Sequence, residues 1–367
     1  MKVVLKLLFL PLALITLFTQ CEKDPEPVKI PDDAFLSALI ELGVDTNGDG
    51  EISPIEAEAL IYLNVSGEYL NGEPGAIGNI SDMTGIESFI NLIRLICNNN
   101  RLTNLDVSGC AVLRILDCGA NQLTSLDISK NASLQELNCV GNQLTSLDIS
   151  NNVFLQELKC DVNQLTILDV SNNTALTELY CDGNQITSLD FSNNTALTRL
   201  SCVRNQITSL DISNCPVLTE LLCEENQLTS LDVSNNAELQ YLHCRINQLA
   251  SLDVSNNTDL GSLDCAENQL DNLDVFGCAD LAELWCNYNQ LTNLDVSSNT
   301  ALRYLFCNMN ELSSLDVSKN TALLILGLTD MLTLEEVCVW ETPFPPAGIS
   351  VDIDGSPNVY FTTECSK

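Results

Sequence analysis

The segment Leu176-Thr-Glu-Leu179-Tyr-Cys181-Asp-Gly-Asn184-Gln-Ile186-Thr-Ser-Leu189-Asp190-Phe191-Ser-Asn-Asn194 is one copy of a unit that occurs eleven times. A cysteine marks the unit and recurs every 21 residues from Cys97 to Cys307. An asparagine three residues after each cysteine keeps the same step, and so does the aspartate of a Leu-Asp pair. A fixed short period is typical of a solenoid, in which each repeat buries its apolar face only against its neighbours.

Each period contains two short segments with alternating apolar residues. In the first copy one segment runs from Leu95 to Cys97 and the other from Leu105 to Val107. Alternation of this kind favours β-strands, and equivalent strands of successive copies would stack in register. We therefore predict a β-rich solenoid with two short parallel strands per repeat and with Leu102 also turned inward.

The frame Leu-x-x-Leu-x-Cys-x-x-Asn-x-Leu is carried in the first copy by Leu92, Leu95, Cys97, Asn100 and Leu102. It resembles the frame of leucine-rich repeats, with cysteine at a position that leucine usually holds. The whole period is similar to the 21-residue bacterial repeats sometimes called the IRREKO type. The resemblance covers residues 92–326, and it implies a surface protein that serves adhesion or interaction.

Seventeen cysteines raise the question of disulfides and metal sites. Neighbouring cysteines of the stack would lie about 4.8 Å apart with parallel side chains, whereas a disulfide needs Cβ atoms about 3.8 Å apart. No pair has zinc-ligand spacing, so we interpret the ladder as small buried hydrophobic residues. Cys110, Cys215 and Cys278 replace a second asparagine of their repeats. Cys338 and Cys365 lie beyond the repeats, and we predict that a disulfide joins them.

The first twenty residues are predicted to be an export signal. Two lysines precede an apolar run that is too short for a stable membrane span. Cys21 then resembles the acylated cysteine of bacterial lipoproteins, although Gln20 stands where a small residue is usual. This predicts a lipid anchor at the outer membrane or cell surface, with residues 21–31 as a tether. The alternative is a secreted protein that is cleaved elsewhere.

Residues 32–62 have the pattern of a helix, a twelve-residue EF-hand calcium loop and a second helix. Gly50 falls where the loop turns sharply, and oxygen donors fall at the spacing that wraps around one calcium ion. The predicted calcium ligands are Asp45, Asn47, Asp49, Glu51, Ser53 and Glu56. The alternative is an acidic turn that only resembles such a loop.

Composition limits the remaining function classes. The net charge of −35 argues against nucleic acid as a partner, because binding there relies on lysine and arginine. The chain has one histidine, His243, and no recognisable catalytic motif surrounds it, so we predict no enzyme activity. Residues 63–91 are predicted to be degenerate repeats, and residues 327–367 are predicted to cap the stack.

The two outward surfaces of the stack differ in how much their residues vary from repeat to repeat. The aspartate of the Leu-Asp pair never changes from Asp106 to Asp316, which suits either hydrogen bonds to the following turn or a cation-binding stripe. The residues beside the buried leucine of the first strand vary, and large side chains gather there in the last repeats. We predict a partner-binding surface formed by Tyr241, His243, Trp285, Tyr288, Tyr304, Phe306 and Met309. The alternative is that capping loops or neighbouring subunits cover these side chains.

We predict a non-enzymatic surface protein that binds a protein or host-surface partner on this face. A glycan is the alternative ligand, since tryptophan and tyrosine also stack on sugar rings. A hydrolase is a further alternative, but an invariant stripe of aspartates does not create the distinct environments that separate an acid from a base.

Overall fold

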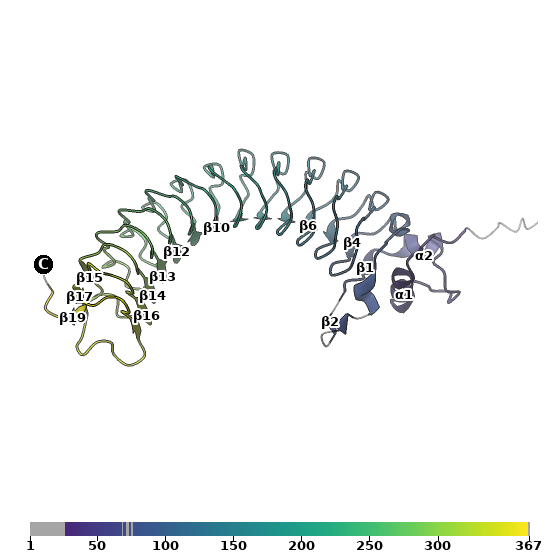
Figure 1. Cartoon of the computed structure of the whole chain (residues 1–367). Coiled ribbons are helices and arrows are strands. Elements are labelled where there is room, and N and C mark those ends of the chain that lie inside the picture. The colour runs from purple at the N-terminus through teal and green to yellow at the C-terminus, as the bar shows by residue number, and fades with distance from the viewer. Residues whose placement is uncertain (1–25, 68, 71–72, 75, 366–367) are drawn as a thin grey trace, which may run out of the picture.

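A computed structural model of the protein describes residues 26–67, 69–70, 73–74 and 76–365. The predicted export signal (residues 1–20) and the predicted acylation site Cys21 lie outside the described residues. The described chain is a curved solenoid whose successive turns fan out along an arc, with a small helical unit at its N-terminal end (Figure 1). The predicted solenoid is therefore confirmed.

One parallel sheet of 14 strands lines the concave side of the arc. Each strand has three residues, of which the middle one is apolar and the flanking two are mostly exposed or half-buried. Equivalent residues pair from turn to turn, as Leu95 pairs with Leu116. The strands are β1 (Tyr62–Asn64), β4 (Arg94–Ile96), β5 (Ile115–Asp117), β6 (Glu136–Asn138), β7 (Glu157–Lys159), β8 (Glu178–Tyr180), β9 (Arg199–Ser201), β10 (Glu220–Leu222), β11 (Tyr241–His243), β12 (Ser262–Asp264), β13 (Glu283–Trp285), β14 (Tyr304–Phe306), β16 (Ile325–Gly327) and β18 (Ser350–Asp352).

The N-terminal unit consists of helices α1 (Asp33–Glu41) and α2 (Pro54–Ala59). Asp32 caps α1 by accepting a hydrogen bond from the Phe35 N–H, and Ser53 forms a capping box with Glu56 at the start of α2. Short elements lead from there into the stack: β2 (Tyr69–Leu70), β3 (Glu73–Pro74), η1 (Ala76–Asn79) and η2 (Ile86–Ser88). Within the described residues, no helix has the length and apolar character needed to span a bilayer.

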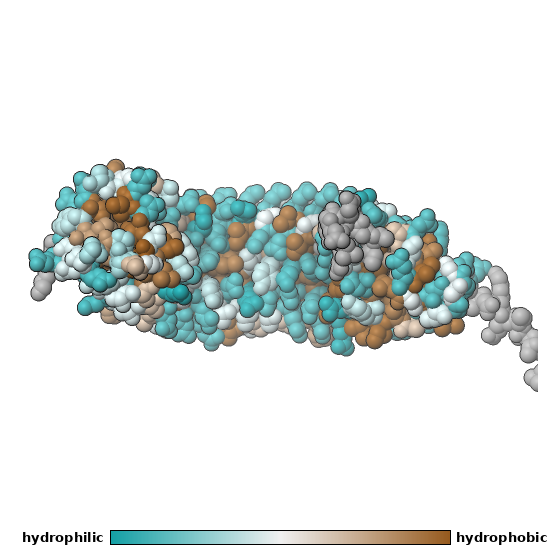
Figure 2. Space-filling view, turned by 90° about the horizontal axis from the view of Figure 1, so that it is seen from below, coloured by the Kyte–Doolittle hydropathy of each residue, from teal (hydrophilic) through white to brown (hydrophobic). Residues whose placement is uncertain are grey.

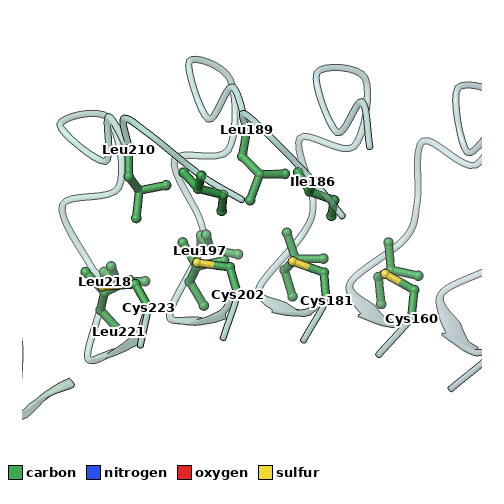
Figure 3. Close-up of a cluster of buried hydrophobic side chains, with 14 of the residues drawn as sticks. Cys160, Cys181, Ile186, Leu189, Leu197, Cys202, Leu210, Leu218, Leu221 and Cys223 are labelled. Atoms are coloured by element: carbon green, nitrogen blue, oxygen red, sulfur yellow. The ribbon is translucent and has the colours of Figure 1, made fainter. Parts of the chain in front are cut away.

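The core is a repeated set of leucine, cysteine and valine or isoleucine side chains between the two sides of each turn (Figure 3). The predicted inward residues Leu95, Cys97, Leu102, Leu105 and Val107 are all buried. The cysteines of the ladder are free thiols, as predicted. Burial, together with nearby aspartates, raises their pKa (that of Cys139 to about 12), so the ladder cysteines are hydrophobic core residues without thiolate reactivity.

Two ladders of buried asparagines hold successive turns together. In the first, the Asn205 amide nitrogen donates to the carbonyls of Cys181 (3.0 Å) and Cys202 (3.1 Å), and its oxygen accepts from the Ile186 N–H (3.0 Å). In the second, Asn194 donates to two backbone carbonyls, but its own oxygen is buried without a hydrogen-bond partner. The first ladder therefore uses both ends of the amide and the second uses only the donor end.

This difference explains where cysteine replaces asparagine. Cys110, Cys215 and Cys278 occupy positions of the second ladder, and their thiols lie close to backbone carbonyls of earlier turns, such as that of Asn194 at 3.6 Å from the Cys215 sulfur. A thiol is a weak donor and occupies less space than an amide. It is accepted at this position because the asparagine that it replaces contributes only its donor.

The prediction of two strands per repeat is wrong for most of the stack. On the convex side of the described residues, the strands are limited to β15 (Ser314–Asp316), β17 (Glu336–Cys338) and β19 (Tyr360–Thr362), with isolated bridges such as that between Asp190 and Asp211. Curvature spreads the turns on this side (Figure 1), whereas a ladder needs strands about 4.8 Å apart.

The C-terminal segment that was predicted as a cap instead continues both sides of the stack. Leu326 of β16 pairs with Val351 of β18, which is 25 residues on (351 − 326) instead of 21. A disulfide joins Cys338 of β17 to Cys365, with Cα atoms 5.4 Å apart. The segment 327–367 thus holds strands β17, β18 and β19 where only a covering piece was expected.

Candidate partner-binding site

The candidate site is the part of the concave face that strands β11 to β14 form. The predicted residues Tyr241 and His243 lie in β11, Trp285 lies in β13, and Tyr304 and Phe306 lie in β14. Their side chains point away from the core because the middle leucine of each strand is the buried residue. The structure therefore brings these five together on one surface. Figure 2 views the molecule from below, from the open side of the arc, where the middle of the stack is largely hydrophilic with scattered hydrophobic residues.

Three of the rings form a continuous row across the sheet. The Trp285 and Phe306 rings are stacked with centroids 6.2 Å apart and an angle of 4° between their planes. The His243 ring meets Trp285 edge-on at the same centroid distance. Beyond Phe306 the next strand has Gly327, where an added Cβ would lie only 2.7 Å from the Phe306 ring. Glycine at this position is thus what lets the ring lie over the next strand.

Tyr288 and Met309 extend the surface along the edge that follows the strands. Both lie in the left-handed region (φ 56° and 52°) and are 51% and 39% exposed. This position is left-handed throughout the stack: it is glycine at 141 and 183, but other turns have non-glycine residues such as Val162, Arg204 and Ile246. The conformation is therefore a property of the repeat, and it points the side chains of Tyr288 and Met309 no differently from those of the other turns.

A network of charges surrounds His243. Its Nδ1 lies 3.6 Å from a Glu224 carboxylate oxygen, and its Nε2 lies 3.1 Å from the Ser262 hydroxyl. Ser262 in turn donates to Glu283 (3.2 Å). Burial acts to lower the pKa of His243, but the hydrogen bond to Glu224 and the charges of Glu224, Asp264 and Glu283 outweigh it, so the pKa is raised.

Glu224, His243 and Ser262 have the side-chain types of a nucleophilic triad, but their arrangement does not present a nucleophile. Ser262 is only 2% exposed, and its hydroxyl donates to Glu283. A protonated His243 satisfies the network because it donates from both ring nitrogens, to Glu224 and to Ser262. The network is best explained as a set of ion pairs that fixes the position of the histidine beside Trp285.

Sequence analysis missed this network. Glu224, Ser262 and Glu283 belong to three different turns, and only the pairing register places them beside His243. The 21-residue period contained this information, because residues that are 21 positions apart in the sequence lie beside each other on neighbouring strands. The predicted surface drew only on the large side chains at these positions.

The invariant aspartates of the convex side accept hydrogen bonds from the turn that follows them, which was one of the two interpretations of this stripe. In all eleven repeats the aspartate accepts a hydrogen bond from the N–H two residues later, as Asp148 does from Ser150 at 3.0 Å. The same contacts lower the pKa of most of these carboxyls. The stripe is therefore engaged within its own turns.

The predicted calcium loop has the right donors, but they do not all converge. Asp45, Asn47 and Asp49 accept N–H groups within the loop, and Gly50 takes a left-handed turn (φ 84°). Ser53 and Glu51 follow in the expected order, but Ser53 is the cap of α2. In the described chain no three His, Cys, Asp or Glu side chains are grouped closely enough to hold a metal ion.

Glu56, the predicted ligand at the last position of the loop, is held by hydrogen bonds within the loop. Its two oxygens accept hydrogen bonds from Thr46 (2.7 and 2.8 Å), Asn47 and Ser53. These bonds, the Ser53 backbone N–H first, lower the pKa of Glu56 to about 2. The loop is therefore closed by hydrogen bonds that hold Glu56 in place, and a calcium ion would have to compete with them.

Comparison with known proteins identifies the scaffold. The functional domain of InlJ from Listeria monocytogenes, described as including a cysteine ladder, is 35% identical with a TM-score of 0.79, and the match covers 90% of this chain and 70% of that one. The chain belongs to the leucine-rich-repeat family. A family model for "Leucine Rich repeats (2 copies)" also matches residues 174–215 of this leucine-rich-repeat protein.

Two further structures share the fold of this leucine-rich-repeat protein. An internalin (inlF) from Listeria monocytogenes is 24% identical with a TM-score of 0.64, over 85% of this chain and 97% of that one. A plant peptide hormone receptor, RGFR1 in complex with RGF2, is 24% identical with a TM-score of 0.63, over 71% of this chain and 46% of that one. No curated protein matches the sequence.

Proposed function

We propose that this leucine-rich-repeat protein binds a protein partner through the concave face of β11 to β14. The observation that carries the proposal is the row His243, Trp285 and Phe306, whose half-buried rings lie side by side on the concave sheet. Clustered aromatic side chains in partly desolvated positions are typical of interaction hot spots. The plant receptor RGFR1, which shares the fold, was solved in complex with RGF2.

A glycan ligand is the second candidate, because tryptophan and tyrosine stack on sugar rings. Stacking needs an open ring face, and Trp285 is flanked by Phe306 on the β14 side and by His243 on the β11 side. The ring edges that remain open suit side chains of a protein better than the flat face of a sugar. A protein partner is therefore the first choice.

A site-specific crosslinker tests this proposal. A photoreactive amino acid at Tyr304 should capture a defined protein from the native surroundings, whereas the same group at Ile167, which is 73% exposed and lies elsewhere on the repeat, should not. Capture at Tyr304 should be lost with Trp285→Ala. Equal capture at both positions, or saturable sugar binding that depends on Trp285, would reject a protein partner at this face.

We further propose that the protein is exported and held at the cell surface as an adhesion or interaction protein by a lipid on Cys21. The apolar N-terminal segment with its lysines, followed at once by a cysteine, supports this. Cys21→Ala should move the protein from the membrane fraction to the soluble fraction. If the variant stays in the membrane fraction, the anchor lies elsewhere.

Calcium at residues 45–56 remains a proposal that rests on donor spacing. Binding would require Glu56 to exchange its hydrogen bonds with Thr46 and Ser53 for the ion. Calorimetry with calcium should show one site that Asp45→Asn and Glu56→Gln abolish, while the matched control Glu51→Gln keeps it, because position seven of such a loop contributes a backbone carbonyl. Absence of a binding signal in the unchanged protein would make the loop a calcium-independent turn.

A further inference from the structure

A second surface lies on the flank of the N-terminal turns, beside the first residues of the concave strands β1, β4 and β5. It contains a hollow of about 450 Å³ that is lined by Ile61, Ile93 and Val112, among others. These three side chains are 59%, 39% and 43% exposed. These apolar side chains lie close together on consecutive turns around one hollow, and such a cluster is a candidate contact surface.

The same flank also carries a protruding aromatic side chain. Phe154 is 60% exposed, and it occupies the position that Val112 and Ser133 hold two turns and one turn earlier. Ser133 lines the near edge of the hollow, so Phe154 stands on the next turn, about 5 Å further along the stack. A hollow and a protruding ring therefore lie side by side on one face of one chain.

The charges of this flank suit a second copy of the chain. Two copies with a net charge of −35 each would repel at long range. The rim of the hollow carries Glu58 and Arg114, one of each sign, and neither forms an ion pair within the described residues. The lining of the hollow therefore has no net charge, so a ring from a second copy can enter it without meeting an excess of negative charge.

We propose that this flank is a two-fold interface in which Phe154 of each copy fills the hollow of the other. In a two-fold contact both copies use the same surface. If residue i of the first copy touches residue j of the second, then residue j of the first also touches residue i of the second. A protrusion and a hollow on the same flank meet this condition. Because Phe154 and Val112 lie two turns apart with Ser133 between them, the two-fold axis passes close to Ser133, whose small side chain allows close approach.

Sedimentation equilibrium of the purified protein tests this interface. We expect a concentration-dependent dimer in the unchanged protein, and Phe154→Glu should raise its dissociation constant by roughly 100-fold, because two rings are replaced per dimer. Ile167→Glu is the matched control, since Ile167 is at least as exposed (73%) but lies off this flank, and it should leave the dimer unchanged. Both positions are exposed, so the thermal midpoint of each variant should match that of the parent.

A cysteine placed near the axis tests the geometry independently. The ladder cysteines are buried and Cys338 is already bridged, so Ser133→Cys introduces an accessible thiol into the described chain. Mild oxidation should give a disulfide-linked dimer with Ser133→Cys and none with Ile167→Cys. A monomer at every concentration, a dimer that Phe154→Glu leaves intact, or equal crosslinking of the two cysteine variants would overturn the proposal. None of these results bears on partner binding at β11 to β14.

Discussion

The two halves of each repeat use their polar side chains in different ways. On the convex half, each aspartate bonds to its own turn and each buried asparagine spans to an earlier turn, so these groups are engaged inside the scaffold. On the concave half, the groups beside the buried leucine bond mainly to one another, as His243 does with Ser262, and their identities change from strand to strand. The comparison separates positions that hold the fold from positions that are available for a partner.

The largest effect on stability is expected in the first asparagine ladder. Asn205→Leu removes all four hydrogen bonds of the amide. It leaves the Ile186 N–H buried without a partner, whereas the Cys181 and Cys202 carbonyls each keep a bond from a neighbouring asparagine. With about 1–3 kcal/mol for the unpaired N–H and about 1 kcal/mol for each of the other bonds that are lost, we expect a loss of about 3 kcal/mol or more in the free energy of unfolding. Urea unfolding followed by circular dichroism measures it. The concave variant Tyr288→Ala should change this free energy by less than about 0.5 kcal/mol.

The second expectation separates the two asparagine ladders. Asn194→Cys should cost less than about 1 kcal/mol, because Cys215 already fills the next position of that ladder. Asn205→Cys should cost roughly 2 kcal/mol more, since a thiol does not replace the amide oxygen that the Ile186 N–H needs. Equal losses in urea unfolding would show that the unused oxygen of the second ladder does not explain the cysteines.

The smallest effect concerns the charge network beside Trp285. The raised pKa of His243 means that the network's contribution is fully present below about pH 6.5, the value expected for an unfolded histidine, and is lost as pH rises through the folded value. His243 is the only histidine, so its ring gives a single NMR titration curve. Glu224→Gln should shift that curve to lower pH. A midpoint at or below 6.5 in the unchanged protein would contradict the network.

Much of this fold follows from the sequence because the repeats are strict. The 21-residue step, the buried Cys97 column and the bonding role of Asn100 depend on local spacing, and the structure agrees with each. The second strand could not be predicted from Leu105 and Val107 alone. Alternation shows which residues turn inward, but it does not show that curvature separates neighbouring turns or that Asp106 accepts the Ser108 N–H.

The candidate site was predictable only in part. The clustering of aromatic residues could be predicted, because the place of a residue within the 21-residue period determines its place on the sheet. The partners of His243, the stacking of Trp285 on Phe306 and the hollow beside Val112 depend on which side chains reach across turns. The continuation of the stack past Leu326 was missed because the spacing changes there, while the pairing of strands does not.

The most direct test compares an aromatic residue from each half of the repeat. Once the protein captured at Tyr304 is identified, its affinity can be measured by calorimetry for the unchanged chain, Trp285→Ala and Phe276→Ala; Phe276 is 69% exposed in a convex turn, directly after Val275. We predict that Trp285→Ala weakens binding by about 2 kcal/mol, or roughly thirtyfold, and that Phe276→Ala has no effect. Equal affinities for Trp285→Ala and the unchanged chain would contradict the concave face of β11 to β14 as the binding surface.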